Sequence, residues 1–540
     1  MAKPIQSLTI VGGGTSGWLA AAFLAQLCQN ELRDGSMAIT LIESPNIPKI
    51  GVGEASAPGL PNTFRAIGLD ERKFIKEANA TFKLSGYFDG WNVDAEGRPK
   101  RWVNSFMSVP SIAGRSPGYF YLKYGRGEGL EFSNSISACP EAIDAKRGPR
   151  PLNARDYESM LLYAYHMDAM VVADQLRDIS VSLGVRHIRD DVTAVNLDER
   201  GYVASLGLKE QGQHPIEFVI DATGFAGLII NKALGEPFQP FDKYLVNDRA
   251  AVVQIPHEDP TQIAPITQAI AMSAGWRFSV PLYNRIGTGY IFSSKFTSDD
   301  EAITELKQHI GAQADGKDPR IIPMRIGKTR RSWVKNCVAI GLSSGFAEPL
   351  EATAIHSVDL AVRWLYAHFP DSDFSPALRK SYNRLVDEFY AEVIDFIVLH
   401  FHLNNRTDSE YWVAAREETP IPDSLAENLE LWRHKMPRPS DFKTEHFFNT
   451  NTYLAALMGK GFYDDITLDL PGVIEADWRQ FIAARRAQNQ QIVNQLPGHY
   501  ELLQNIRGET PSPPGNVATQ PSWAVGPGAQ PINFSYKLGK

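Results

Sequence analysis

The chain has 540 residues, of which 43% are hydrophobic and 21% charged, a composition typical of a globular protein with more than one domain's worth of core. The net charge is −8 and no basic cluster stands out, which argues against nucleic-acid binding. The three cysteines lack the spacing of a disulfide framework or a zinc site. With no signal peptide and no apolar run near the roughly 20 residues of a membrane span, we expect a cytoplasmic protein without a metal.

The chain opens with a strand that enters a glycine-rich turn and then a helix. The apolar run 8–11 is followed by Gly12, Gly14 and Gly17, which match the pattern G-x-G-x-x-G. In such a turn the first glycine permits the tight bend, the second lets a pyrophosphate approach the backbone, and the third lets the helix pack closely on the strand. A helix is predicted from Trp18 through Leu24, and the free N–H groups at its start attract the same anion. Thr15, within the turn, is a further candidate for contact with the cofactor.

Two further strands support a dinucleotide site at this turn. The apolar run 38–42 ends in Glu43, which is placed to accept a hydrogen bond from a ribose hydroxyl. The buried-type run 218–227 contains Asp221 and resembles the strand that closes the dinucleotide site in flavin enzymes. The pattern therefore predicts an α/β fold with a Rossmann-like sheet and a bound dinucleotide.

Three segments after the second strand have less regular patterns. The Pro- and Gly-rich segment 44–60 is predicted to be a loop, which either lies against the cofactor or simply connects two elements. A strand is predicted over 81–91, and a lone lysine such as Lys83 on a strand is usually exposed to solvent. The aromatic-rich stretch 102–124 is predicted to be irregular, either covering a substrate or packing as a loop.

The rest of the chain is predicted from its periodicity as a series of strands and helices. We expect a helix over 157–183, strands over 185–188, 192–197 and 334–340, antiparallel strands within 246–297, a helix from Thr353, and mostly helices over 375–505. The first turn of the helix at Thr353 would present free N–H groups to an anion. The Pro-, Gly- and Ser-rich tail is expected to lack a fixed fold. These changes divide the chain into regions 1–374, 375–505 and 506–540.

The segments from about residue 5 to about residue 505 resemble, in the same order, the flavin-dependent halogenases of the tryptophan halogenase family. The glycine turn is followed over 50–56 by IGVGEAS, which includes Val52 and Gly53 and is similar to that family's loop over the flavin. GLSSGFAEPLEATAI, over 341–355, matches the family segment that carries an active-site glutamate and a halide site. The resemblance implies the FAD-binding, Rossmann-like fold of flavin monooxygenases, with an antiparallel sheet and a mostly helical C-terminal substrate region.

The family's W-x-W-x-I-P signature is present in altered form. Its positions are Trp276, Phe278, where the family has a second tryptophan, and Pro281, with valine in place of isoleucine at position 280. The segment GTGYIFSSKFTS, over 287–298, follows the signature and fits the family well. Two adjoining matches in the expected order support the resemblance more strongly than the glycine turn does.

Alignment with the family assigns roles to individual residues. Lys83 falls on the catalytic lysine and Glu351 on the catalytic glutamate, while Gly341 falls at the flavin. Thr353 and Ala354 fall where backbone N–H groups hold the halide. The family usually has Ser-Thr-Gly after the glutamate, and the alanines of this chain remove a hydroxyl partner of the lysine and crowd the halide. The preference between chloride and bromide is therefore open.

The resemblance also implies a two-site mechanism. FADH2 from a separate flavin reductase, O2 and a halide give hypohalous acid, which reaches a separate substrate pocket. There Lys83 holds and polarises the oxidant, by a hydrogen bond or as a haloamine, with a pKa tuned by burial and neighbours. Glu351 orients the oxidant or takes the proton from the halogenated ring. A homodimer is compatible with the sequence, which does not determine the oligomeric state.

The match is weakest where the substrate binds. Tryptophan-specific members hold the amino-acid backbone with a glutamate, which falls near Lys443 here, and with paired tyrosines that have no counterpart. A histidine beside the active site falls at Asn104, while Phe106 and Phe448 are either stacking rings or ordinary core aromatics. Because free tryptophan would leave its ammonium unpaired, we expect indole or a simple indole derivative. The alternatives are a tryptophan halogenase proper, a flavin-dependent aromatic hydroxylase, and a flavin-binding sensor without catalysis.

Overall fold

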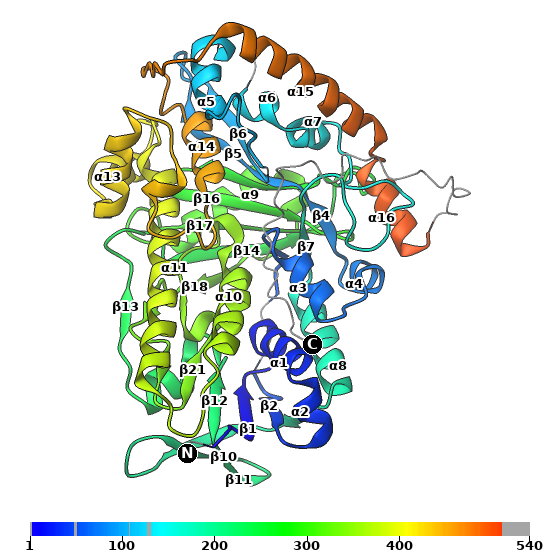
Figure 1. Cartoon of the computed structure of the whole chain (residues 1–540), viewed down its shortest axis with the longest axis vertical. Helices are drawn as coiled ribbons and strands as arrows, with labels where there is room; N and C mark the ends of the chain where they lie inside the picture. The colour runs from blue at the N-terminus through cyan, green and yellow to red at the C-terminus, as the bar shows by residue number, and fades with distance from the viewer. Residues whose placement is uncertain (1–2, 48–50, 107, 127–130, 510–540) are drawn as a thin grey trace.

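A computed structural model of the chain describes residues 3–47, 51–106, 108–126 and 131–509. Most of the predicted C-terminal tail and Ile50 of the predicted flavin loop lie outside the described residues. Figure 1 shows two large sheets, one in the lower half of the molecule and one in the upper half, with the long helix α11 (Pro376–His402) running alongside both. None of the described helices has the length and apolar character that a membrane crossing requires.

The lower sheet has six strands in the order β20-β21-β12-β1-β2-β8. Its strands are β1 (Ser7–Val11), β2 (Ala38–Glu43), β8 (Arg186–Arg189), β12 (Phe218–Asp221), β20 (Trp333–Val334) and β21 (Cys337–Ala339). β1 pairs in parallel with both β2 and β12, so it is an inner strand of the sheet. Open α/β sheets bind their ligands beyond the carboxyl ends of such strands.

Three helices pack together beside the lower sheet. They are α1 (Thr15–Leu27), α8 (Ala169–Ser182) and α10 (Thr353–Ala367), of which α1 contacts both others. The start of α10 and the strand β2 that ends in Glu43 agree with the predictions from sequence, whereas α1 begins at Thr15, three residues before the predicted Trp18. The strand predicted over 334–340 is instead a hairpin of β20 and β21, because Lys335 adopts a left-handed conformation with φ 54°.

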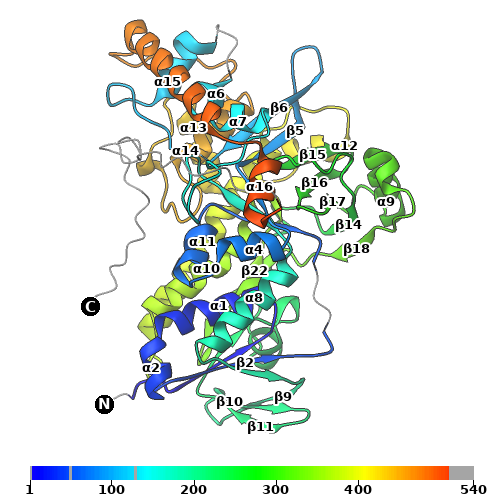
Figure 2. The ribbon, with the colours of Figure 1, turned by 90° about the vertical axis from the view of Figure 1, so that its right-hand side faces the viewer.

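The upper sheet has seven strands in the order β18-β14-β17-β16-β15-β5-β6. Its strands are β5 (Ser85–Val93), β6 (Pro99–Ser105), β14 (Arg249–Ile255), β15 (Ile266–Met272), β16 (Gly275–Pro281), β17 (Ile286–Phe292) and β18 (Arg320–Pro323). Antiparallel pairing joins β14 to β17 and β15 to β16 to β17, as predicted, but β15 pairs with β5 in parallel. Figure 2 shows α9 (Asp299–Ile310) on the outer side of this sheet.

A third, small sheet carries the segment around Lys83. It consists of β3 (Glu54–Ala55), β7 (Ala164–Met167) and β4 (Thr81–Lys83), in the order β3-β7-β4. The strand predicted over 81–91 is broken at Leu84, whose N–H donates to Pro265 O at 2.8 Å. As a result, β4 and β5 belong to different sheets, and Lys83 lies at the junction between them.

Two other predictions of local structure were wrong. The helix predicted over 157–183 is the strand β7 followed by α8, because every residue of β7 is buried and a short continuous apolar run has no diagnostic period. The stretch 102–124, predicted to be irregular, contains the end of β6 and two short helices over 117–125. The prediction for 102–124 depended on its aromatic, Pro, Gly and Ser content, and it holds for residues 108–116, which lie in no helix or strand.

Two three-stranded sheets and the short helices complete the described fold. The sheets are β9 (Val192–Leu197), β10 (Val203–Leu208) with β11 (Gly212–Pro215), and β13 (Phe238–Pro240), β19 (Gly327–Thr329) with β22 (Gly345–Phe346). The short helices of the first 150 residues are α2 (Gln29–Asp34), α3 (Leu60–Ala66), α4 (Glu71–Glu77), α5 (Pro117–Phe120), α6 (Phe132–Ile136) and α7 (Cys139–Asp144).

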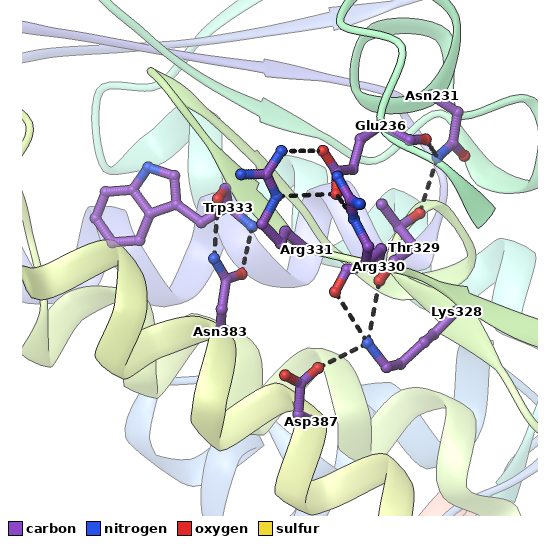
Figure 3. Close-up of polar contacts among 9 residues, drawn as sticks. All are labelled: Asn231, Glu236, Lys328, Thr329, Arg330, Arg331, Trp333, Asn383 and Asp387. Carbon is purple, nitrogen blue, oxygen red and sulfur yellow. Dashed lines mark hydrogen bonds and ion pairs between the residues drawn. The ribbon is translucent and has the colours of Figure 1, made fainter. Parts of the chain in front are cut away.

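Helices dominate the chain after residue 375. After α11 they are α12 (Glu410–Glu417), α13 (Asp423–Trp432), α14 (Thr450–Gly459), α15 (Glu475–Gln495) and α16 (His499–Arg507). Polar contacts drawn in Figure 3 join α11 to β19 and β20: Lys328 Nζ lies 2.6 Å from Asp387 Oδ1, and Asn383 exchanges two hydrogen bonds with the backbone of Trp333. A domain boundary near residue 374 stays a prediction.

Candidate active site

The glycine turn at the end of β1 has the geometry that the pattern predicts. Gly12 has φ 120°, and a Cβ on it would lie 2.2 Å from Ala222 O, so only glycine fits the bend. A Cβ on Gly17 would lie 1.9 Å from Gly12 O, which shows how closely α1 packs on the turn. Among the described residues, no atom lies within 4 Å of a Cβ position on Gly14. This open face at the start of α1 is where a phosphate would lie.

Glu43 lies at the end of β2 and faces the same turn. A Cβ on Gly13 would lie 2.3 Å from Glu43 Cδ, so the carboxylate touches the turn. Its Oε2 lies 3.0 Å from Nε2 of His187 on β8, a partner that the sequence did not suggest. The hydroxyl of Thr15 donates to Ala169 O at 3.2 Å and so joins α1 to α8. Glu43 is therefore paired with His187, and its contact with a ribose stays a prediction.

Asp221 is fully buried at the end of β12, and its carboxylate organises the turn that follows. Its oxygens accept hydrogen bonds from the backbone of Thr223, Ile229 and Ile230 and from the hydroxyls of Thr223 and Ser343. These contacts engage both oxygens, so the side chain shapes the edge of the sheet. A contact between Asp221 and a cofactor stays a prediction.

The predicted flavin loop packs against the upper sheet. Gly53 has φ 119°, and a Cβ on Gly287 of β17 would lie 2.3 Å from Val52 O. This close approach connects the loop to the segment that follows the Trp276 signature. Gly341, with φ 57°, brings its segment against the start of α1, because a Cβ there would lie 2.4 Å from Ser16 Oγ. The close approach at Gly287 thus packs the loop on β17, and the close approach at Gly341 packs its segment on α1.

Lys83 is buried, with only 5% of its surface exposed, in agreement with the burial that the resemblance implies and unlike most lone lysines on strands. Its Nζ donates to the carbonyl of Ser56 at 3.1 Å and lies 5.4 Å from the ring centre of Phe106. Burial lowers the pKa of Lys83 to about 8, while the negative charge of Glu351 opposes that shift. Lys83 and Glu351 are far apart in the sequence, but their charges interact in the folded protein.

Contacts on both sides of Lys83 hold its strand in place. The amide of Phe82 donates to Nε2 of His499 on α16 at 3.1 Å, and the other ring nitrogen of His499 contacts Ile263 O at 2.9 Å. The hydroxyl of Thr81 donates to the carbonyl of Pro281 at 2.6 Å. The end of the Trp276 signature therefore supports the strand that carries Lys83.

The first residue of the signature supports the other catalytic candidate. Trp276 Nε1 and Asn247 Nδ2 both donate to Oε1 of Glu348, at 2.5 Å and 2.8 Å. Burial raises the pKa of Glu348 to about 7, and the two hydrogen bonds oppose the shift. Phe278 accepts a backbone hydrogen bond from Thr288 Oγ1 at 2.6 Å. The signature is therefore a structural feature that holds the turn before Glu351.

Glu351 lies in a strained turn immediately before α10. Glu351 and Ala352 both have left-handed conformations, with φ 66° and φ 55°. Non-glycine residues reach such conformations at a cost of about 1–3 kcal/mol, and functional sites are where they are typically found. Oε1 of Glu351 accepts a hydrogen bond from Asn104 Nδ2 at 2.9 Å, and Nε2 of His400 lies 3.3 Å away from the same oxygen.

The halide candidates lie at the start of α10, as predicted. Thr353 is the first residue of the helix and is buried, and Ala354 follows it. The residue at the N-cap, Ala352, has no side chain that could cap the helix. The first-turn N–H groups are thus not satisfied by a side-chain cap, which leaves the helix start open to an anion. Halide binding itself stays a prediction.

The two substrate rings lie in different surroundings. Phe106 follows β6 and is partly exposed beside Lys83. Phe448 is 2% exposed and stacks on Phe396 of α11 with 4.1 Å between ring centres. Its backbone N–H donates to Glu392 at 2.5 Å, so the segment is pinned to α11. Of the two rings, Phe106 is the one that lies next to a catalytic candidate, while Phe448 packs as a core aromatic.

Lys443 does not face a buried substrate site. Its side chain is 84% exposed, and Nζ lies 3.8 Å from Oε1 of Glu388 on α11. His400, by contrast, is a functional candidate that the sequence analysis missed. It is fully buried within an apolar helical run, and such a lone histidine is usually a core residue with ordinary hydrogen bonds. Only the approach of α11 to Glu351 brings it to the site.

Comparisons with known proteins agree with these features. A family model described as tryptophan halogenase matches residues 7–470. Tryptophan 7-halogenase RebH of Lentzea aerocolonigenes is 35% identical over 540 residues, which cover 94% of this chain and all of that relative. The structure of tryptophan 6-halogenase SttH from Streptomyces toxytricini is 34% identical, with a TM-score of 0.86 over 93% of this chain and 100% of that one.

A further structural relative is not named for tryptophan. BrvH, a flavin-dependent halogenase from Brevundimonas sp. BAL3, is 32% identical, with a TM-score of 0.82 over 93% of this chain and 99% of that one. Similarity of sequence and structure thus extends over nearly the whole length of enzymes of one kind. The glycine turn, the buried Lys83 and the strained Glu351 lie within the matched residues. This chain is an enzyme that belongs to the tryptophan halogenase family of flavin-dependent halogenases.

Proposed function

We propose that this enzyme uses FADH2, O2 and chloride or bromide to halogenate a small electron-rich aromatic, an indole or a simple indole derivative. The observation that carries the proposal is the buried Lys83 under the electrostatic influence of Glu351. A lysine is seldom buried in a protein unless a carboxylate pairs with it. A buried lysine with a perturbed pKa is therefore a candidate catalytic residue. A sensor that only binds flavin has no need of this pair.

The described residues around the glycine turn fit a bound FAD. The open face beside Gly14 leaves room for the pyrophosphate, and the start of α1 supplies N–H donors. Glu43 is the candidate for the ribose, and Val52 and Gly53 belong to the loop that would cover the flavin. When bound, the reduced flavin would supply the reduction of O2 that converts a halide to hypohalous acid. The start of α10 at Thr353 and Ala354 would hold the halide.

Lys83 has the donors to hold hypohalous acid. Its ammonium has three N–H groups, and among the described residues only the carbonyl of Ser56 accepts from it. A second N–H would donate to the oxygen of the oxidant, so that the halogen becomes electrophilic. When the halogen bonds to a ring carbon, the O–halogen bond breaks and the oxygen takes a proton from Lys83 to leave as water. The lysine is then a neutral amine, a state that burial stabilises.

Glu351 is the candidate base for the second half of the reaction. The halogenated ring carbon carries a surplus proton, and its loss restores the aromatic ring. No donor among the described residues reaches Oε2 of Glu351, while Oε1 is held by Asn104. Oε2 would take the proton from the ring carbon and return it to the Lys83 amine, which restores both groups. Protons and electrons then balance, since ring C–H and hypohalous acid become ring C–halogen and water.

The substrate proposal depends on the absence of a partner for an amino-acid ammonium. Lys443 occupies the position where tryptophan-specific members have a glutamate, and its cationic head lies in solvent near Glu388. A buried ammonium without a counter-charge is strongly disfavoured. RebH and SttH are named for tryptophan, whereas the name of BrvH states no substrate. Among the described residues of this region, the charges favour an uncharged indole.

The test supplies the enzyme with FAD, NADH, a separate flavin reductase and either bromide or chloride. The substrate panel contains indole, tryptophan and a phenol, and products are identified by mass spectrometry. Halogen isotope doublets on an indole product are the expected result. Incorporation of oxygen instead of halogen would favour a flavin-dependent hydroxylase. A parallel reaction without the enzyme but with reductase controls for halogenation by free oxidant.

A further inference from the structure

His400 lies at the end of α11 in an entirely aromatic setting. The side chain is fully buried and stacks on Phe88, with 4.4 Å between ring centres and 18° between planes. Trp102 stacks beside it at 5.7 Å, and Phe396 meets the ring edge-on at 4.8 Å. These contacts fix both the position and the plane of the imidazole. Its ring nitrogens therefore point in directions set by packing from three elements.

The hydrogen bonding of His400 is unusual for a buried side chain. Among the described residues, neither ring nitrogen has a well-aligned hydrogen-bond partner. The nearest acceptor is Oε1 of Glu351, 3.3 Å from Nε2. Buried polar groups are nearly always satisfied, so an exception calls for an explanation. A small movement of Glu351, which lies in a strained turn, would complete a hydrogen bond from Nε2–H.

The surroundings keep His400 neutral. Burial lowers the pKa of its imidazole, and the charge of Glu351 opposes that shift. The other charged group that faces it among the described residues is Lys460 at the end of α14, which adds to the lowering. Lys460 is itself buried, with Nζ 3.0 Å from Asn92 Oδ1. A neutral imidazole has one N–H donor, which can lie on Nε2.

Asn104 supplies a second neutral donor to the same oxygen. Its Nδ2 donates to Oε1 of Glu351 at 2.9 Å, and the amide cannot be reversed because its oxygen would then face the carboxylate. The carbonyl oxygen Oδ1 is buried and has no hydrogen-bond partner among the residues that the structure describes. Two neutral donors on Oε1 would restrict rotation of the carboxylate without adding a positive charge beside it. The other oxygen, Oε2, then has a defined direction.

We propose that His400 is a positioning residue for Glu351, with its neutral imidazole donating Nε2–H to Oε1 so that Oε2 faces the substrate. The inference rests on the proposed function, because it assigns Oε2 the task of taking the ring proton. His400 itself touches neither substrate nor cofactor. Its contribution is the orientation of a base, and small errors in the placement of a catalytic group are costly in rate.

Two amide substitutions test the role of the N–H position. The amide nitrogen of glutamine in His400→Gln can occupy the position of Nε2, whereas His400→Asn places its amide near Nδ1. We expect His400→Gln to keep kcat within about threefold of the natural enzyme and His400→Asn to lose about tenfold, the effect of one lost hydrogen bond. KM for indole should change little in either variant. Thermal unfolding and FAD binding of both variants control for loss of fold.

A double-mutant cycle separates positioning from packing. If Asn104 and His400 act on the same oxygen, the losses in kcat from Asn104→Ala and His400→Asn should not be additive. Equal kcat in His400→Gln and His400→Asn, or full additivity in the cycle, would overturn the proposal. These results are distinct from failure of the proposed function, in which the natural enzyme forms no halogenated product at all.

A measurement independent of turnover completes the test. In protein labelled with ¹⁵N-histidine, the His400 signal is assigned by its absence from His400→Gln. We expect a neutral ring protonated on Nε2 at pH 7, with a shift that changes in Glu351→Gln. An imidazolium, or a ring protonated on Nδ1, would contradict the assignment even if the enzyme proved inactive.

Discussion

Lys83 combines two properties that seldom occur in one side chain, since it is buried and has a pKa near neutrality. Removal of water from Nζ is the dominant cause of the lowered pKa, and Glu351 limits the shift. A lysine with a pKa of about 8 is mostly an ammonium at pH 7, yet it gives up a proton at little cost. That is the property required of a group that protonates a departing oxygen once per turnover.

Replacement of Lys83 by alanine tests this role directly. Lys83→Ala should reduce halogenation at least about 100-fold, because a positioned acid typically contributes that much or more. FAD binding should be unchanged, since the lysine lies outside the glycine turn. Product is measured by mass spectrometry and FAD binding by titration. Lys73→Ala, which changes an exposed lysine on α4, is the matched control. Halogenation retained in Lys83→Ala would rule out the assigned role.

The pKa of Lys83 also predicts a pH dependence. Its value in the folded protein is lowered from 10.5 to about 8, so the ammonium form is lost as pH rises through 8. If the ammonium is the active form, kcat should fall by about tenfold per pH unit above 8 to 9. Initial halogenation rates between pH 6 and 10, with FADH2 saturating, give the profile. Reductase activity is followed over the same range. A profile that is flat up to pH 10 would indicate an ordinary, solvated lysine.

At the scale of elements, β4 depends on a helix that lies more than 400 residues later in the chain. His499 of α16 is fully buried, accepts the Phe82 amide and contacts Ile263 O through its other nitrogen. This arrangement requires a neutral imidazole with its proton on Nδ1. The sequence predicted a strand around Lys83, but the pairing of β4 with β7 and its support by α16 are long-range contacts with no local signal.

Loss of His499 should destabilise the fold. His499→Ala leaves the buried Phe82 N–H without an acceptor, and we expect a loss of about 1–3 kcal/mol in the free energy of unfolding. Denaturant unfolding measures the loss, and His434→Ala, which removes an exposed histidine, is the matched control. An equal effect of the two substitutions would show that the contact with β4 contributes little.

Burial lowers the pKa of His499 from 6.5 to about 4, so the unfolded chain binds its proton more readily than the folded protein does. The stability that His499 contributes is therefore fully present above pH 6.5 and is lost as pH falls towards 4. The natural enzyme should lose stability over this range more steeply than His499→Ala, which has no such group. Melting temperatures of both proteins between pH 4 and 7 test the difference.

At the scale of the whole molecule, the glycine turn belongs to the lower sheet, whereas Lys83 and Glu351 lie outside that sheet. The turn follows β1 in the lower sheet, while Lys83 is the last residue of β4, which lies beside the upper sheet (Figure 1). The loop that contains Val52 and Gly53 packs on β17 and carries the carbonyl of Ser56 that binds Lys83. One loop thus borders both parts of the proposed reaction.

Substrate preference is a property of this whole arrangement. We expect kcat/KM for indole to exceed that for tryptophan by about tenfold or more, because among the described residues Lys443 occupies the position at which a carboxylate would pair with the ammonium of tryptophan. Tryptamine, which carries the ammonium without the carboxylate, is the control and should also be poor. Competition reactions with mass-spectrometric detection give the ratios. Tryptophan converted faster than indole would show that the interpretation of Lys443 is wrong.

The sequence by itself determined the glycine turn, the strand ending in Glu43, the helix starting at Thr353 and the family to which the chain belongs. These features are encoded locally, in spacing and residue type, and in the order of motifs. Only the tertiary structure decided that Lys83 is buried, that β7 is a strand, and that His400 and Asn104 meet at Glu351. Burial and long-range contact depend on how distant segments pack, and no periodicity within one segment records which neighbour will cover it.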